Sequence, residues 1–247
     1  MADRFYHPGP LGLGDVTLDG PEAHHLANVR RFGPGDVVAL FNGDGREYPA
    51  TVIEVGKKRA RLHVTTVETP DREIGFRLHL AAALPKGDRG DFLIEKLTEL
   101  GVTDFTPLLT ERGVVKADDA KAEKLRRAVI EASKQCGRNV LMTVHPPAKW
   151  SDWCRTVTGE RYLAHPGAAA RGSAHRDVTV AVGPEGGFAD AEVAAAVATG
   201  WHLLSLGKTV LRVETAALAA AVWATSSPAA PAPSATPPAR PATSTAL

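Results

Sequence analysis

Two glycine-bearing loops toward the carboxyl end of the chain hold the residues best suited to chemistry. The first, GPEGGFAD, begins at Gly183 after the apolar run VTVAV and leads into AEVAAAVATG, which has a helical composition. Glycine lets a ligand approach the backbone closely and tolerates positive φ, so we expect such a conformation at Gly186. The loop has neither the GxGxxG spacing of a dinucleotide site nor the Lys-Ser/Thr of a phosphate loop. Taken alone, the glycines fit a ligand site and a simple tight turn about equally well.

The second loop, LGKTVLRVETAA, follows the next predicted strand and also opens a helix. It places Arg212 and Glu214 beside Thr215, a residue type that commonly caps a helix N-terminus. Because ligands of α/β sheets gather at the carboxyl ends of strands, two such loops on consecutive strands can face one pocket. The structural alternative is a surface ion pair between Arg212 and Glu214, which would contribute about 0–1 kcal/mol.

Other cationic residues are candidates for contact with an anionic partner. Arg112 follows a predicted strand at the ligand-facing edge of its sheet, and Arg138 ends a helix, so both could contact the phosphates of such a partner. His24, His25 and the run KKRAR at 57–61 could extend that contact, although a solvated basic turn explains such a run more often. The four tryptophans are interpreted as packing residues.

The elements that position these residues fall into two parts, of which the first spans residues 1–72. Short β-type runs separated by the turns GPGD, NGDG and GKKR predict a small barrel. The segment HHLANVRRF ahead of them fits a short helix that exposes Arg30 and Arg31. The part ends in the linker ETPDRE. Its expected strands are Val37–Phe41, Tyr48–Val55 and Arg61–Val67.

After the linker, strands and helices alternate, which predicts an α/β domain with a parallel sheet over residues 73–225. Ordinary topology rules favour an open, doubly wound arrangement. Residues 226–247 are rich in Pro, Ala, Ser and Thr, cannot form a core and are expected to be disordered. The expected strands are Phe76–Leu84, Asp104–Leu109, Arg161–His165, Asp177–Gly183 and His202–Leu206, and the expected helices are Arg89–Leu100, Asp118–Cys136, Asp190–Thr199 and Thr215–Ala224.

Composition limits the classes of function. The chain has 247 residues, of which 44% are hydrophobic, enough for a sizeable core. No run approaches the roughly 18 apolar residues of a membrane span, and MADRFYHPGP lacks the apolar run of a secretory signal, so we expect a cytoplasmic protein without membrane contact. A net charge of +1 means that any nucleic-acid footprint must be local. Cys136 and Cys154 have no metal-ligand spacing, and no metal is expected.

Several motifs that follow one another in a fixed order give a closer interpretation. VGPEGGF and LGKTVLRVETAAL are preceded by LPKGDRGDFLIEKLTELGV, TPLLTERGVV and EASKQCGR, and the N-terminal part contains RFY, HHLANVRR and PGDVVALFNGDG. From residue 4 to residue 224, this series resembles the RsmE family of SPOUT-class methyltransferases, which methylate N3 of a uridine in small-subunit (16S) ribosomal RNA. The chain departs from the family pattern at NVLMTV, after QCGR, and in its tail.

The resemblance implies a PUA-like N-terminal β-barrel and a C-terminal SPOUT α/β domain whose last strands and helix thread a deep trefoil knot. It implies S-adenosylmethionine as cofactor, 16S ribosomal RNA within the small subunit as partner, and a homodimer. The residues that it assigns to the cofactor are His165, Gly183, Pro184, Glu185, Gly186, Gly187, Ser205, Leu206, Gly207, Val210, Leu211 and Thr215. Those that we expect to contact RNA are Arg4, His25, Arg30, Arg31, Arg112 and Arg138.

Methylation of uridine N3 removes the proton of a weakly acidic imide and develops negative charge on the ring. Arg212 and Glu214 are therefore the candidate catalytic residues. Arg212 could hold a uracil oxygen or the phosphate, while Glu214 could position Arg212 or accept the proton. We favour Arg212 as the orienting group and Glu214 as its support. No metal is required, because a sulfonium is already an excellent leaving group.

Two other functions stay open on the sequence. A ribosome-associated RNA-binding or assembly factor would keep both domains without transferring methyl groups, although the intact GPEGG and LRVETA loops argue against it. A methyltransferase of the same class could act on another RNA or on a ribose 2′-hydroxyl. Calorimetry with adenosylmethionine separates the first alternative from an enzyme, since a binding factor need not keep the cofactor pocket.

Overall fold

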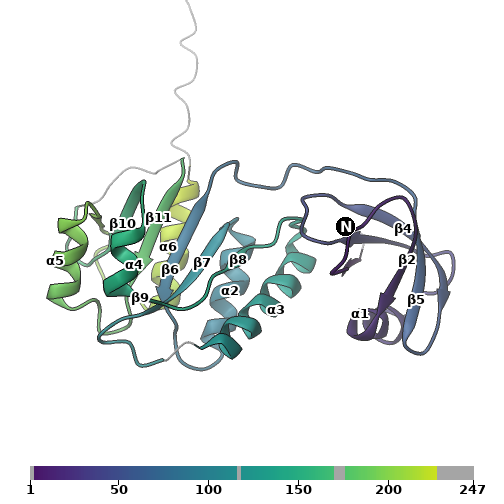
Figure 1. Cartoon of the computed structure of the whole chain (residues 1–247), viewed down its shortest axis with the longest axis horizontal. Helices are drawn as coiled ribbons and strands as arrows, with labels where there is room; N and C mark the ends of the chain where they lie inside the picture. Colours follow the sequence, from purple (N-terminus) through teal and green to yellow (C-terminus); the bar gives the residue numbers. More distant parts are fainter. Residues whose placement is uncertain (1–2, 116–117, 170–175, 227–247) are drawn as a thin grey trace, which may run out of the picture.

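The computed structural model describes residues 3–115, 118–169 and 176–226, which form two lobes (Figure 1). The N-terminal lobe is built on one sheet with the strand order β1-β3-β4-β5-β2. Strand β1 pairs in parallel with β3, and the other neighbours are antiparallel. The strands are β1 Arg4–Tyr6, β2 Gly14–Asp19, β3 Val37–Phe41, β4 Tyr48–Val55 and β5 Arg59–Val64.

The side chains of this sheet alternate between core and solvent. In β5, Ala60, Leu62 and Val64 are buried while the residues between them are exposed, as expected for a sheet with one covered face. Helix α1 (Gly20–His24) continues into the π-helical turn η1 (His25–Val29) and brings Leu26 into the same core. A short helix was expected over residues 24–32; the helical residues are 20–29, so Arg30 and Arg31 follow the helix and do not belong to it.

The C-terminal lobe is built on a sheet with the order β12-β10-β11-β6-β7-β8, and β9 pairs with β7. Its pairings are parallel, which confirms the expected sheet type. Every residue of β6 and β11 is buried, because helices cover both faces of these strands. The strands are β6 Leu78–Ala83, β7 Asp104–Leu109, β8 Thr143–Val144, β9 Ala148–Lys149, β10 Glu160–Ala164, β11 Val178–Val182 and β12 His202–Leu204.

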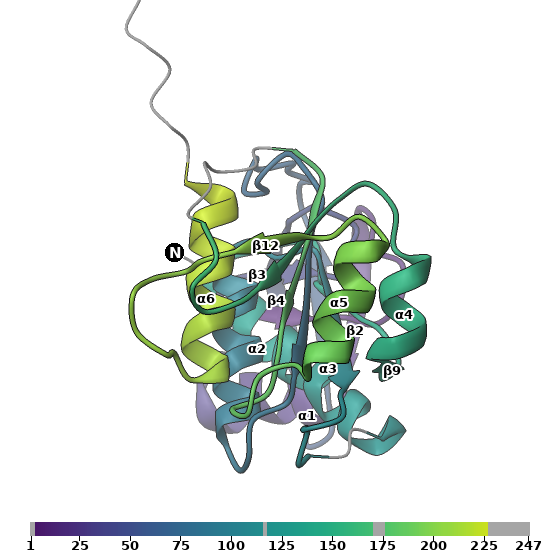
Figure 2. The ribbon, with the colours of Figure 1, turned by 90° about the vertical axis from the view of Figure 1, so that its left-hand side faces the viewer.

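Two groups of helices sandwich this sheet (Figure 2). Helices α2, α3 and α6 pack over a large aliphatic core on one face. Helices α4 and α5 cover the other face, where an aromatic core gathers around Trp150, Trp201 and Phe188. The helices are α2 Arg89–Glu99, α3 Asp119–Cys136, α4 Trp150–Thr156, α5 Asp190–Ala198 and α6 Val213–Thr225.

Within the described ranges, no helix is both long and apolar enough to cross a membrane. Disorder was predicted for residues 226–247. Ser226 is instead the C-cap residue of α6, with its N–H donating to the carbonyl of Val222 at 2.7 Å, and residues 227–247 lie outside the described ranges. The trefoil knot is a property of a chain path that includes residues 170–175, also outside them, so it stays a prediction.

Candidate functional site

A cavity of about 370 Å³ opens at the carboxyl edge of the parallel sheet. Its walls come from the loops that follow β10, β11 and β12, which are neighbours in the sheet, and from the first turn of α6. Cavities of roughly 300–1,000 Å³ at such strand ends are the usual ligand sites of α/β proteins. The lining comprises residues 164–166, 182–188, 190, 206, 207, 209–211, 213 and 216, together with Arg112.

Most residues expected to hold a cofactor line this cavity: His165, Gly183, Pro184, Glu185, Gly186, Gly187, Leu206, Gly207, Val210 and Leu211. Two do not. The hydroxyl of Ser205 donates to the carbonyl of Gly207 at 3.2 Å, within its own loop. Thr215 is exposed in the first turn of α6.

The expected helix cap at Thr215 is wrong. Helix α6 begins at Val213, and Arg212 is its N-cap residue, with an extended backbone at φ −65° and ψ 158°. The carbonyl of Arg212 already accepts the N–H of Ala216 at 2.8 Å, so Thr215 lies inside the helix that it was expected to open.

The glycine loop owes its shape to Gly183 and Gly187. A Cβ atom at Gly183 would lie 2.9 Å from a ring carbon of Phe188, a distance that leaves no room for a side chain. Gly187 has a φ of 68° and closes a turn in which its N–H donates to the carbonyl of Pro184 at 2.8 Å. Gly186 has no positive φ, and a Cβ there would make an ordinary 3.5 Å contact with Arg112. The conformational requirement expected at Gly186 therefore belongs to Gly187.

Aromatic packing fixes the far side of this loop. The ring centroid of Phe188 lies 4.7 Å from that of Trp150, which in turn lies 5.1 Å from Trp201. Both indole N–H groups donate to backbone carbonyls, Trp150 to Glu192 at 3.3 Å and Trp201 to Cys154 at 2.8 Å. Trp150 and Trp201 are 0% and 2% exposed, so their interpretation as packing residues is confirmed.

Arg112 belongs to the wall of the cavity. Its Nη1 donates to the carbonyls of Gly186 at 3.0 Å and Phe188 at 3.5 Å. The N–H of the neighbouring Glu111 donates to Glu192 at 3.0 Å, near the start of α5. The loop after β7 is thus fastened to the glycine loop and to the helix that follows it, and the exposed Arg112 lies where the two meet.

The two candidate catalytic residues point in different directions. Arg212 is exposed, and its side chain makes no hydrogen bond or ion pair with the described residues. The side chain of Glu214 is only 9% exposed, and its Oε1 lies 3.3 Å from Nη1 of Arg89 in α2. The pairing of Glu214 with Arg212 is absent because residues two apart on a helix face different sides. Glu214 supports Arg89 rather than Arg212.

Sequence reasoning missed Arg89. The residue stands in the KGDR motif, at the first position of α2, and its guanidinium also lies 3.4 Å from Glu185 in the glycine loop. The KGDR motif, as part of the family resemblance, was a signal that Arg89 contributes to the site. Nothing local indicated a partner in α6, because Arg89 and Glu214 lie 125 positions apart in the chain.

Arg138, expected to contact RNA, lies in the junction between the lobes and is 3% exposed. Its Nη2 donates to Glu73 at 2.6 Å, and its Nη1 donates to the carbonyls of Thr98 at 3.0 Å and Val102 at 2.9 Å. The guanidinium is therefore enclosed and holds protein acceptors, contrary to the expected phosphate contact.

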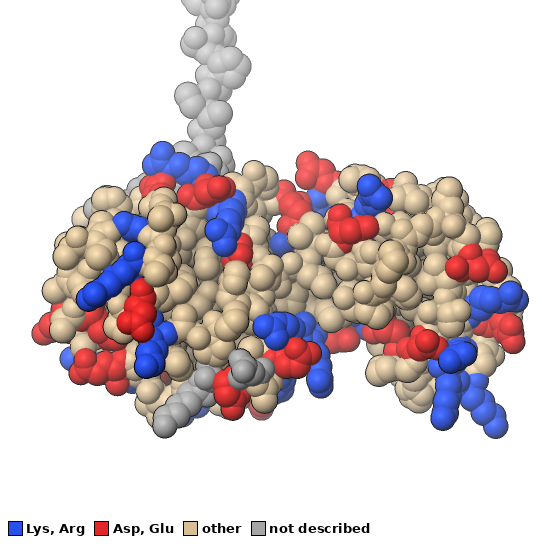
Figure 3. Space-filling view, in the orientation of Figure 1, with Lys and Arg blue, Asp and Glu red and all other residues tan. Residues whose placement is uncertain are grey.

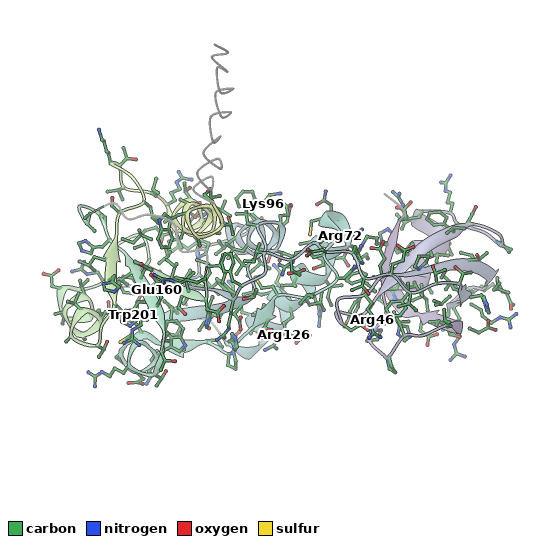
Figure 4. The ribbon with its side chains drawn as sticks, turned by 90° about the horizontal axis from the view of Figure 1, so that it is seen from above. Arg46, Arg72, Lys96, Arg126, Glu160 and Trp201 are labelled. Atoms are coloured by element: carbon green, nitrogen blue, oxygen red, sulfur yellow. The ribbon has the colours of Figure 1, made fainter. Side chains whose placement is uncertain are left out.

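Arg4, also expected to contact RNA, is 6% exposed in the same junction. It pairs with Glu47, and its Nη2 donates to the carbonyl of Arg138 at 2.9 Å. Burial lowers the pKa of its guanidinium, and Glu47 opposes that shift. Arg72 lies between the lobes as well (Figure 4), where Nη1 donates to Glu47 at 2.8 Å and to the carbonyl of Gly137 at 2.7 Å. These arginines tie the two lobes together.

The other candidates for RNA contact lie on the N-terminal lobe. Arg30 and Arg31 are exposed just after η1, where Arg30 pairs with Asp3 and Arg31 has a φ of 60°. His25 is half-buried, edge-on to the ring of Phe5 at 5.9 Å. Basic and acidic side chains are interspersed over the face shown in Figure 3, without a continuous basic band. The RNA contacts of these residues stay predictions.

Comparison with known proteins identifies the family. Residues 72–225 match the family model of an RNA methyltransferase domain, and residues 18–65 match that of an RNA methyltransferase PUA domain. The ribosomal RNA small subunit methyltransferase E of Synechocystis sp. is 35% identical over 212 residues, which cover 81% of this chain and 69% of that protein. The chain belongs to the RsmE family.

Two solved structures extend the similarity of this RsmE-family chain to the fold. A ribosomal RNA small subunit methyltransferase E from Neisseria gonorrhoeae, bound to S-adenosylmethionine, is 32% identical with a TM-score of 0.84. A methyltransferase from Legionella pneumophila, also in complex with this cofactor, is 34% identical with a TM-score of 0.84. Each match covers 90% of this chain and 96% of the other. The expected combination of a PUA-like domain with a SPOUT α/β domain is confirmed.

Proposed function

We propose that the chain binds S-adenosylmethionine in the cavity at the carboxyl edge of the sheet and methylates N3 of a uridine in 16S ribosomal RNA, in the cytoplasm. One observation carries the proposal. The GPEGG and LGKTVL loops, separate in sequence, form walls of a single cavity. The RsmE relative from Neisseria gonorrhoeae, whose structure superposes over most of the chain, is bound to this cofactor.

The residues present fit the cofactor. The cavity volume of about 370 Å³ falls within the range for small-molecule ligands. Val182, Leu206 and Leu211 offer apolar surface that would suit an adenine ring, and the glycine loop offers backbone polar groups. The carboxylates of Glu185 and Asp190 also line the cavity and would suit a ligand that carries positive charge.

The chemistry follows from what these residues can do. When bound, the sulfonium supplies an activated methyl group whose transfer needs no metal. Arg212 stands between Leu211 and Val213, which both line the cavity, and is itself exposed and outside the lining; in this proposal its long side chain contacts a base that enters there. The planar guanidinium of Arg212 can orient a uracil oxygen or phosphate and stabilise the negative charge that develops as N3 releases its proton to water. Glu214, buried against Arg89, acts as structural support in this scheme.

We extend the proposal to a homodimer that acts on the small ribosomal subunit. Val210, in the loop after β12, is 79% exposed, and Val222 of α6 is 47% exposed. Apolar side chains exposed on the loop after β12 and on α6 suit a surface that a second copy would cover. Arg30 and Arg31 on the N-terminal lobe remain available for RNA phosphates. Light scattering at micromolar concentration tests the dimer directly.

Nucleoside analysis of ribosomal RNA from cells that lack this protein tests the proposal, with the wild-type gene restored as a control. Selective loss of N3-methyluridine, recovered on complementation, supports the assignment. Loss of a different modified nucleoside would show that the enzyme methylates that nucleoside and not N3 of uridine. Binding of S-adenosylmethionine without any change in modification would favour an assembly factor.

A further inference from the structure

We propose that Arg89 is a positioning residue that fastens the start of α6 to the glycine loop and thereby sets the shape of the cofactor cavity. The inference rests on the proposed function. Arg89 does not line the cavity itself, whereas both elements that it joins do: Glu185 in the glycine loop, and Val213 with Ala216 in the first turn of α6.

Each nitrogen of the Arg89 guanidinium has a different acceptor. Nε donates to the carbonyl of Lys86 at 3.3 Å, which fixes the plane of the group against the turn that precedes α2. Nη1 donates to Glu214 at 3.3 Å, and Nη2 donates to Glu185 at 3.4 Å. A planar fork can hold two carboxylates in two fixed directions, which a lysine ammonium cannot do.

Charge and burial make Arg89 necessary to this arrangement. The Glu214 side chain is 9% exposed, and a carboxylate at that depth is costly without a cation beside it. Arg89 is its ion-pair partner among the described residues. Glu185 is 44% exposed and carries the second negative charge toward the same guanidinium. Without Arg89, two carboxylates on adjacent walls of the cavity would lose their shared cation and repel each other.

The link reaches the catalytic candidate as well. Glu214 follows Arg212 by two positions in the first turn of α6, so an anchor on Glu214 restrains the helix end that carries Arg212. Loss of Arg89 is therefore expected to weaken cofactor binding and to slow methyl transfer at saturating cofactor. A purely structural ion pair would lower thermal stability and leave both quantities unchanged.

The test measures calorimetric affinity for S-adenosylmethionine beside thermal melts. Arg89→Ala is expected to raise the Kd about tenfold, the usual scale for coupling between charged neighbours. Lys96→Ala is the matched control: Lys96 lies on the same helix, pairs with Glu95 and Glu99 and is labelled in Figure 4. Its Kd should equal that of the wild type.

Two further variants separate positioning from general destabilisation. Adding Glu214→Gln to Arg89→Ala should recover part of the lost affinity, because the buried carboxylate that lost its cation is then neutral, and Glu214 does not line the cavity. Arg89→Lys should fall between wild type and Arg89→Ala, and it supplies the measurement if the alanine variant does not fold. If Arg89→Ala binds S-adenosylmethionine with wild-type affinity, the inference about Arg89 is wrong while the proposed function stands. Arg89→Lys serves the same purpose if the alanine variant does not fold. A wild-type chain that binds no S-adenosylmethionine would overturn the proposed function.

Discussion

Arginines occur both in the junction between the two lobes and beside the cofactor cavity, but two in the junction are buried, whereas two beside the cavity are exposed. Arg4 and Arg138 are 6% and 3% exposed and donate to protein carboxylates and carbonyls on several sides. Arg112 and Arg212 are exposed, and Arg212 has no side-chain partner in the described part of the chain. Residue type suggests an RNA contact in all four cases. Burial distinguishes Arg4 and Arg138, which only hold the protein together, from Arg112 and Arg212, whose exposed guanidinium groups can meet a substrate, although Arg112 also holds the glycine loop.

The largest expected effect is on folding stability, from Arg138→Ala in the junction between the lobes. The change removes the donor of the Glu73 carboxylate and of the Val102 carbonyl, and one of two donors of the Thr98 carbonyl, so we expect a loss of about 3–5 kcal/mol in the free energy of unfolding. Denaturant unfolding measures it. Arg127→Ala is the control: Arg127 lies in α3, which ends two residues before Arg138, and its side chain is 77% exposed, so the change should cost at most about 1 kcal/mol. Wild-type stability combined with weakened RNA binding would instead make the junction an RNA surface.

At the cavity, Arg212→Ala should lower the single-turnover rate about 10²–10³-fold, the scale for removing one donor that stabilises developing charge. Affinity for S-adenosylmethionine and the melting temperature should change far less, because Arg212 holds no described part of the protein. Arg212→Lys should rescue little, since an ammonium lacks the planar fork. A normal rate at saturating cofactor in Arg212→Ala would remove this residue from the catalytic candidates.

A pair of glycine variants sharpens the account of the cavity wall. Gly187→Ala forces a residue with a Cβ to adopt a φ of 68°, at a cost of roughly 1–2 kcal/mol, and should weaken S-adenosylmethionine binding about tenfold. Gly186→Ala only adds a 3.5 Å contact with Arg112 and should have a much smaller effect. Calorimetric measurement of the affinity for S-adenosylmethionine in both variants tests this difference. Equal losses would mean that space for the ligand, and not backbone conformation, governs this loop.

The smallest expected effect is the loss of folding stability in Arg72→Ala. Arg72 is 33% exposed and donates from one nitrogen to Glu47 and the carbonyl of Gly137, so its removal should cost about 1 kcal/mol. That corresponds to about 2–4 °C in melting temperature for a chain of this size. Because Arg72 and Arg4 share Glu47, the double variant should deviate from additivity. Strict additivity would mean that the junction is not one network.

The sequence predicted elements well where the signal was local. Strand β7 and the apolar strand β11 are continuous runs bounded by turns, and α2 and α3 agree with prediction to within one residue at each end. The three-residue strand β1, the alternating, partly charged β2, the two-residue strands β8 and β9, and helix α4 were missed. Strand β5 starts at Arg59 and not at Arg61, because pairing with β2 fixes its register.

The residues of the candidate site show the same difference between local signals and contacts over long stretches of chain. The glycine loop and the loop after β12 are contiguous motifs, so their residues could be assigned to one pocket before the fold was known. Arg89 joins Glu214 across 125 positions of chain, and Arg4 reaches the carbonyl of Arg138 across 134. Single-sequence reasoning has no access to such pairs, because they exist only once the chain has folded.

The place of the cavity along the chain also governs when the protein can start to work during its own synthesis. The sheet of the N-terminal lobe ends at Val64, whereas the cavity needs β10, β11, β12 and the first turn of α6, up to Ala216. At the usual elongation rates, the ribosome takes roughly eight to thirty seconds to cross that interval. A nascent chain therefore passes through a stage in which its first lobe is complete while it cannot yet hold a methyl donor.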